Sequence, residues 1–137
     1  MNHHNPLSVV SSLQGKQVFI TGASGFLGKA IVEKILREVP DIGQIHLLIR
    51  GTQRQSAIER CMQGIFASSL FDVLRGQHGT MFEQFINQKV SVVAGELTQP
   101  MFGLDSATFA VTANKLDLII NCAASVNFRE ALDQALQ

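Results

Sequence analysis

Three glycines spaced three residues apart follow a short apolar run. The run is 18–20, and the glycines are Gly22, Gly25 and Gly28. A glycine where a strand ends permits a sharp turn, and a glycine within the turn lets a ligand approach the backbone closely. A helix that begins there has N–H groups without intrahelical partners and a dipole with its positive end at the turn. The pattern predicts a site for a phosphate or pyrophosphate group.

Two hydroxyl side chains in the same loop, Thr21 and Ser24, can donate hydrogen bonds to phosphate oxygens. The spacing is G-x-x-G-x-x-G, whereas the simpler dinucleotide fingerprint is G-x-G-x-x-G. An ordinary turn before a helix is the alternative interpretation. The strand-like run before the loop, the helical pattern after it and the absence of proline within it favour the phosphate site.

The end of the next apolar run, 45–49, indicates which nucleotide binds. In an NAD-selective site an acidic residue at this point holds the ribose 2′-OH. Here Arg50 follows the run, and its guanidinium can bind a 2′-phosphate through charge-assisted hydrogen bonds. Arg54 can assist it. A solvated strand end is the alternative for Arg50, but beside the glycine loop the sequence favours NADP.

Two further segments, after the runs 90–94 and 116–122, are expected to face the same crevice. In the first, Glu96 can accept a hydrogen bond from an adenine amino group and Leu97 can form an apolar wall. A loop carboxylate in solvent is the alternative for Glu96. In the second, small residues let the ribose of a cofactor lie against backbone, unless they simply pack: Ala123, Ala124 and Ser125.

The secondary-structure elements predicted around these residues alternate between strand and helix. Apolar runs predict strands over 17–21, 45–49, 90–94 and 116–122. Amphipathic patterns predict helices over about 25–39, 57–74, 81–86, 104–114 and 130–137. We expect Asp105 or Ser106 to cap the helix over 104–114. The alternation predicts an α/β fold, a Rossmann-like doubly wound parallel sheet of order 3-2-1-4 that is incomplete after about four strands.

Two apolar stripes are expected to face the core of this fold, with helical spacing. The stripe of the first helix is Leu27, Ile31, Ile35 and Val39. The stripe of the second is Ile58, Met62, Ile65, Phe66, Leu70 and Leu74. Residues 1–16 are expected to form a leader, and 17–137 the N-terminal part of the Rossmann domain.

Composition limits the class of protein. The chain has 137 residues, 46% hydrophobic and 16% charged, as expected for a globular domain. Its formal net charge of zero gives no indication of nucleic-acid binding. The cysteines, Cys61 and Cys122, fit a reducing compartment better than a disulfide framework. We expect a cytoplasmic protein with no transmembrane segment, no metal site and no nucleic-acid partner.

Several segments beyond the glycine loop are distinctive, above all VPDI at 39–42, LLIRG at 47–51 and AASVNF at 123–128. Together with the loop they resemble the fatty acyl-CoA reductases, a family within the extended short-chain dehydrogenases, and most of all its bacterial members. The resemblance runs over nearly the whole chain from Gly15. It implies an enzyme that uses NADPH to reduce fatty acyl-CoA to the aldehyde, and in some cases to the fatty alcohol.

The resemblance also implies a role for each matched position. The pyrophosphate loop would comprise Thr21, Gly22, Ser24, Gly25, Phe26, Leu27 and Gly28. Arg50 would select the 2′-phosphate. Glu96 and Leu97 would flank the adenine, although many relatives have Asp where Glu96 stands. The path toward the nicotinamide would be lined by Ala123, Ala124 and Ser125.

One departure from the family concerns the reaction itself. Its members carry a Tyr-x-x-x-Lys motif, in which Tyr donates a proton to the carbonyl and Lys lowers the pKa of that Tyr. This chain contains no tyrosine, so no catalytic residue is assigned. We expect it to be the N-terminal part of a longer reductase, inactive alone, with most of the acyl-binding region further along. An uncovered apolar strand at 118–120 is expected to promote self-association.

Alternative functions stay open at this point. A thioester reductase that releases carrier-bound chains is a close variant. A non-catalytic dinucleotide-binding module would explain the missing tyrosine. A sugar epimerase or dehydratase of the same superfamily shares the glycine loop, but Arg50 and the long segment 51–89 argue against it. Acyl chain length, the choice of aldehyde or alcohol, and membrane association are left open by these residues.

Overall fold

A computed structural model describes residues 8–123 of the chain. Its strands are β1 (Gln17–Thr21), β2 (Gln44–Ile49), β3 (Val90–Ala94) and β4 (Leu118–Asn121). They form one four-stranded sheet of order β3-β2-β1-β4, and every pairing is parallel. The predicted α/β class and strand order are confirmed.

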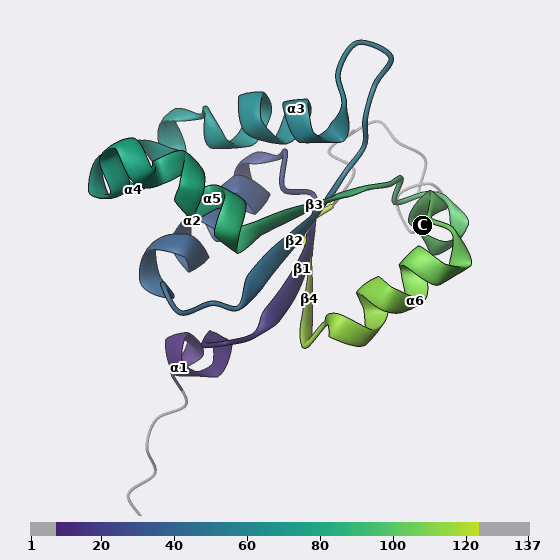
Figure 1. The fold of residues 1–137 in the computed structure, drawn as a ribbon, viewed down its shortest axis with the longest axis horizontal. Coiled ribbons are helices and arrows are strands. Elements are labelled where there is room, and N and C mark those ends of the chain that lie inside the picture. Colours follow the sequence, from purple (N-terminus) through teal and green to yellow (C-terminus); the bar gives the residue numbers. More distant parts are fainter. Residues whose placement is uncertain (1–7, 124–137) are drawn as a thin grey trace, which may run out of the picture.

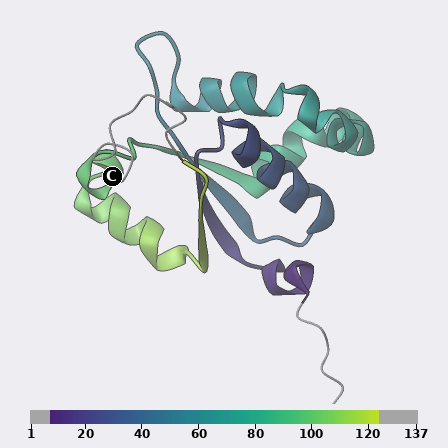
Figure 2. The ribbon, with the colours of Figure 1, turned by 180° about the vertical axis from the view of Figure 1, so that it is seen from behind.

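Helices cover both faces of the sheet (Figure 1). The helices are α1 (Val9–Leu13), α2 (Phe26–Glu38), α3 (Ala57–Cys61), α4 (Asp72–His78), α5 (Phe82–Lys89) and α6 (Ser106–Lys115). Figure 2 shows from behind that α2 to α5 lie on one face of the sheet and α6 on the other. Within residues 8–123, no helix combines the length and the apolar character needed to cross a membrane.

Most of the predicted helices are present within a few residues of their expected bounds. The helix expected over 104–114 is α6, and the Asp105 carboxylate caps it by accepting from the Thr108 N–H at 2.8 Å. The helix expected over 130–137 lies outside the described residues. Helix α1 falls within the segment expected as a leader, and its Leu13 belongs to the main core.

The prediction of one continuous helix over 57–74 is wrong. Helix α3 passes into a π-helical turn at Met62–Phe66, and the chain then leaves the helical path at Ser68. The Ser68 hydroxyl accepts from the N–H of Leu70 at 3.4 Å, a local bond that competes with helix continuation. A 3₁₀ turn, Ser69–Phe71, leads into α4, which ends at Gly79 with φ 53°.

Two predicted core positions are wrong for a common reason. Leu27 is 62% exposed and Ile58 is 64% exposed. On α2 the buried residues are Gly28, Val32, Ile35 and Leu36, a stripe that starts one residue later than predicted. Because successive helical residues lie about 100° apart, burying Gly28 turns Leu27 away from the core. On α3 the buried residues are Ala57 and Cys61, so Ile58 is turned outward in the same way.

The core is divided by the sheet. The larger cluster lies on the side of α2 to α5 and includes Ile20, Ile45 and Leu47. A smaller cluster beneath α6 contains Phe19, Leu48 and Val93, with Phe102, Leu104 and Leu116 packed against it. Alternate residues of the strands serve the two faces, so both sides of the sheet are apolar, as a parallel sheet requires.

Buried polar groups in the described part of the chain have partners. His46 of β2 lies on the α6 side of the sheet, and its Nε2 is 2.7 Å from Oε1 of Gln17. Burial lowers the pKa of His46, because the imidazolium loses hydration, and the charge of Lys115 lowers it further. The neutral side chain is therefore the stable form in this position.

The outer edge of β4 has no strand beside it among residues 8–123. Leu118 is 41% exposed and Ile119 is 61% exposed. Because an open apolar edge is a template for pairing with another chain, we expect the 137-residue chain to self-associate as its concentration rises. Sedimentation velocity over a concentration series measures this, and Ile119→Lys should shift the distribution toward monomer. A wild-type chain that stays monomeric throughout the series contradicts the expectation.

Candidate nucleotide-binding site

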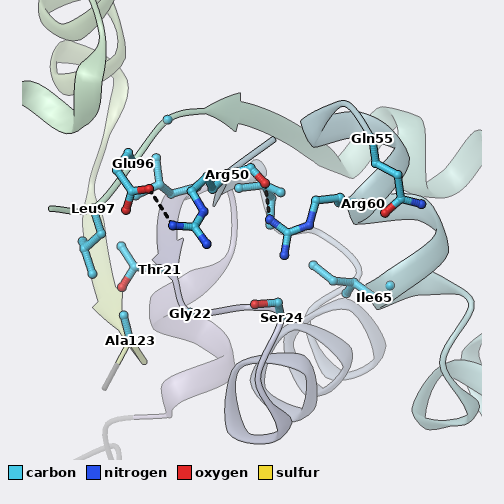
Figure 3. A pocket seen from close by; sticks show the side chains of 14 residues that line it. Thr21, Gly22, Ser24, Arg50, Gln55, Arg60, Ile65, Glu96, Leu97 and Ala123 are labelled. Carbon is cyan, nitrogen blue, oxygen red and sulfur yellow. Dashed lines mark hydrogen bonds and ion pairs between the residues drawn. The ribbon is translucent and has the colours of Figure 1, made fainter. Parts of the chain in front are cut away.

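A cavity of about 340 Å³ opens where the carboxyl ends of β1, β2 and β3 meet (Figure 3). The connections that leave β1 and β3 pass to opposite faces of the sheet, through α2 and α6 respectively (Figure 2). Open α/β sheets bind ligands in the crevice at such a point, beyond the carboxyl ends of the strands. The predicted site residues that line it are Thr21, Gly22, Ser24, Arg50, Glu96, Leu97 and Ala123. The topology thus brings together side chains that are up to about a hundred positions apart, as from Thr21 to Ala123.

The other predicted site residues lie beside the cavity or beyond the described part. Gly25 is the N-cap of α2, and Phe26 begins the helix with its side chain 78% exposed. Among the hydrogen bonds of residues 8–123, none is donated by the backbone N–H of Phe26 or Leu27. These groups retain the capacity to bind an anion. Ala124 and Ser125 lie outside the described residues.

The three glycines of the loop differ in how much space surrounds them. Gly22 has φ +73°, and a Cβ there would lie 2.4 Å from the backbone nitrogen of Ala123. A Cβ on Gly28 would lie 2.1 Å from the Gly22 carbonyl oxygen, so this glycine lets α2 pack on the loop. At Gly25 the nearest atom would be 3.5 Å away, an ordinary contact. The protein itself therefore requires Gly22 and Gly28, whereas Gly25 leaves room beside the loop.

A side-chain contact joins the ends of β1 and β4. The hydroxyl of Thr21 donates to Oδ1 of Asn121, and the N–H of Ala123 donates to the same oxygen at 3.2 Å. Thr21 is buried and lines the cavity, and its hydroxyl proton is used in the contact with Asn121. Asn121 was not among the predicted site residues, although a polar residue at the end of an apolar strand was a visible signal.

An ion pair spans the ends of β2 and β3. Nη1 of Arg50 lies 3.1 Å from Oε2 of Glu96, and the Thr98 hydroxyl donates to the other carboxylate oxygen at 3.3 Å (Figure 3). The hydrogen bond from Arg50 is the main reason that the pKa of Glu96 is lowered. Glu96 is therefore ionised at neutral pH. The Arg50 side chain is 67% exposed, so a ligand in the cavity can reach it without displacing other side chains from the core.

Part of the cavity wall comes from the segment after β2, in which the sequence predicts mainly core residues. Its lining residues are Gln55, Arg60, Gly64 and Ile65. The guanidinium of Arg60 donates to the backbone carbonyl of Arg50, so a second cation lies beside the first. The signal was an arginine one turn into a helix that begins with a Ser56–Glu59 capping box.

Two other residues of this region have no role in the cavity. Arg54 is exposed and does not line the cavity, so its predicted assistance to Arg50 has no structural support. Cys61 is fully buried, and burial raises the pKa of its thiol to about 12. A thiol that stays protonated at neutral pH is a packing residue rather than a nucleophile.

Comparison with known proteins identifies the family. A family model described as Male sterility protein (NAD_binding_4) matches residues 20–137. The chain belongs to this family. It therefore carries an NAD(P)-binding domain, and the resemblance to fatty acyl-CoA reductases predicted from the sequence is confirmed.

Curated relatives carry the corresponding names. The chain is 38% identical over 130 residues to Fatty acyl-CoA reductase 2, chloroplastic, of Arabidopsis thaliana. The alignment covers 95% of this chain and 21% of that relative. It is 35% identical over 130 residues to Alcohol-forming fatty acyl-CoA reductase of Simmondsia chinensis, and this alignment covers 94% of this chain and 26% of that relative. The chain thus spans about a quarter of the length of these relatives. Both are plant proteins, so the bacterial affinity stays a prediction.

Solved structures with a similar fold come from synthetase reductase domains. The terminal R domain of the myxalamid PKS-NRPS pathway has a TM-score of 0.67 at 25% identity, covering 88% of this chain and 27% of that domain. The R domain of a nonribosomal peptide synthetase from Mycobacterium tuberculosis has a TM-score of 0.60 at 30% identity. The match covers 82% of this chain and 25% of that one. The sheet and its covering helices are therefore similar to those of these reductase domains.

The space around Gly28 and Gly25 predicts that replacing each with alanine lowers the free energy of unfolding by a different amount. Gly28→Ala places a Cβ against backbone, so the free energy of unfolding should fall by about 3 kcal/mol. Gly25→Ala meets only an ordinary contact and should cost less than about 1 kcal/mol. Urea denaturation of both variants and the wild type measures the difference. Equal losses for the two substitutions would contradict the packing role of Gly28.

Proposed function

We propose that the chain binds NADPH in this cavity and supplies the cofactor-binding part of a reductase that acts on fatty acyl-CoA. The observation that supports this most is the position of Arg50. It follows the strand at the point where an NAD-selective site has a carboxylate, and it faces the cavity with Arg60 beside it. Two guanidiniums favour the additional phosphate of NADPH over the ribose hydroxyl of NADH.

The residues present fit the parts of such a cofactor. Room beside Gly25 and the free N–H groups at the start of α2 suit a pyrophosphate, with the Ser24 hydroxyl close by. Arg50 and Arg60 would hold the 2′-phosphate, and Glu96 with Leu97 would flank the adenine. The nicotinamide half would extend past Ala123, along the end of β4. When bound, NADPH would supply the hydride, and this chain's own residues would bind and orient it.

Similarity to the curated relatives supports the acyl-CoA substrate. Their names specify fatty acyl-CoA, and the identity of 38% over 95% of the chain exceeds the 25% shared with the myxalamid domain. The R domains nevertheless favour a second candidate, a reductase for carrier-bound thioesters, because the TM-score of 0.67 covers 88% of the chain. A cytoplasmic location is part of the proposal, since Cys61 and Cys122 are free thiols.

The cofactor proposal predicts a loss of discrimination when Arg50 is removed. Arg50→Ala should weaken NADPH binding about 10- to 100-fold and leave NADH binding nearly unchanged, because only NADPH has the 2′-phosphate. Fluorescence titration with both nucleotides measures the two affinities. Arg54→Ala is the matched control, since it removes a nearby arginine that does not line the cavity. Equal affinity of the wild type for NADPH and NADH would contradict the assignment.

The substrate proposal predicts thioester-dependent oxidation of NADPH by the full-length reductase of which this chain is the cofactor-binding part. With palmitoyl-CoA, NADPH absorbance should fall and free CoA thiol should appear in step. The 137-residue chain alone should be inactive, because it has no tyrosine to protonate the carbonyl. Turnover of a carrier-protein thioester but not of acyl-CoA would favour the second candidate. Palmitoyl-CoA-dependent oxidation by the chain alone would overturn the expectation of inactivity.

A further inference from the structure

The loop after β3 contains an unusual backbone turn. Within Pro100–Gly103, Met101 has φ 51° and Phe102 has φ 56°, and Gly103 follows with φ 73°. Left-handed conformations are disfavoured for residues with a side chain, and they persist only where the surroundings hold them. Consecutive residues of this kind indicate that the turn is held from outside its own backbone.

The ring of Phe102 provides that hold. It stacks on Phe19 of β1 with ring centroids 5.7 Å apart and an interplanar angle of 20°. Phe109 of α6 lies on it at 6.3 Å between centroids. The half-buried ring thus packs between the sheet and α6, against the smaller core cluster. This cluster is on the face of the sheet opposite α2, and Phe102 does not line the nucleotide cavity.

The backbone of Phe102 reaches the cavity wall. Its carbonyl oxygen accepts from the N–H of Glu96 at 2.8 Å, and its N–H donates to Gln99, whose own N–H donates to the Glu96 carbonyl at 3.1 Å. Gly95 makes this approach possible, because a Cβ there would lie 2.6 Å from the Phe102 carbonyl oxygen. The turn and the adjoining Gln99 therefore hold the Glu96 backbone through both its N–H and its carbonyl oxygen.

We propose that Phe102 is a positioning residue for the adenosine end of the site, acting through Glu96. The ring anchors the turn, the turn orients Glu96, and the Glu96 carboxylate holds Arg50 at 3.1 Å. The proposal rests on the NADPH site proposed above. Its consequence is that an apolar residue behind the sheet sets the geometry of an ion pair at the cavity, since a carboxylate on a loosely held loop would leave Arg50 unoriented.

The test uses a readout in the ligand-free protein together with nucleotide affinity. In Phe102→Leu the pKa of Glu96, followed by carboxyl carbon NMR, should rise toward its ordinary value because the Arg50 contact is weakened. The dissociation constant for NADPH should rise about five- to tenfold. Phe71→Leu is the matched control: it also replaces a phenylalanine that packs on the sheet, a fully buried one in the core on the other face, and it should leave both quantities unchanged.

Gly95→Ala is the second variant, and it keeps the proposal testable if Phe102→Leu does not fold. It separates the Glu96 N–H from the Phe102 carbonyl without removing an aromatic ring, so the Glu96 pKa should rise again. A wild-type Glu96 pKa in the folded Phe102 and Gly95 variants overturns the positioning role. If the wild type binds no NADPH, the cofactor proposal fails, while the pKa comparison in the free protein still decides whether Phe102 positions Glu96.

Discussion

The structure depends on the close approach of three backbone segments at the end of β1. On one side, the turn after β1 lies against the backbone of Cys122 and Ala123, which follow β4. On the other side, the first turn of α2 packs on it. Neither side leaves room for a side chain, at Gly22 or at Gly28. This contact sets where α2 begins, and hence where its unpaired N–H groups point. It also aligns the end of β1 with β4, where Thr21 and Asn121 meet.

Charged side chains at the ends of β2 and β3 form a second set of contacts beside that backbone. Arg50 and Glu96 come from neighbouring strand ends, and each is partly exposed to water. Such an exposed pair contributes little to stability. The pair instead orients the Arg50 side chain, because it holds this cation at the edge of the cavity, where a ligand can reach it. The contact between Arg60 and the Arg50 carbonyl places a second guanidinium there without a compensating carboxylate of its own among the described ion pairs.

The long connection between β2 and β3 serves both the core and the site. Its helices bury Ile65, Phe66, Phe71 and Leu74 against the sheet and α2. The π-helical turn Met62–Phe66 includes Gly64 and Ile65, which line the cavity. Turns of this kind inside helices are frequent at functional sites. One segment therefore completes the hydrophobic core and forms part of the cavity wall, which links the integrity of the site to that of the core.

The amino-acid sequence alone predicts the strand runs, their alternation with helices, the glycine loop and the position of Arg50 after the second strand. These features depend on local patterns, namely apolar runs and glycine spacing, so they can be read without knowing the neighbours. The family resemblance followed from such segments. The Asp105 cap was visible for the same reason, since capping involves residues only a few positions apart.

Tertiary packing determines which face of each helix is buried and which residues meet at the cavity. Leu27 and Ile58 are exposed because Gly28 and Ala57 occupy the contacts that orient their helices. Arg60, Asn121 and Phe102 acquired their roles from partners that are 10, 100 and 6 positions away, through Arg50, Thr21 and Glu96. The two longer-range contacts depend on the parallel pairing of strands and the return of the chain over the sheet, and the third depends on a ring held between the sheet and α6. No local pattern of residues specifies these arrangements.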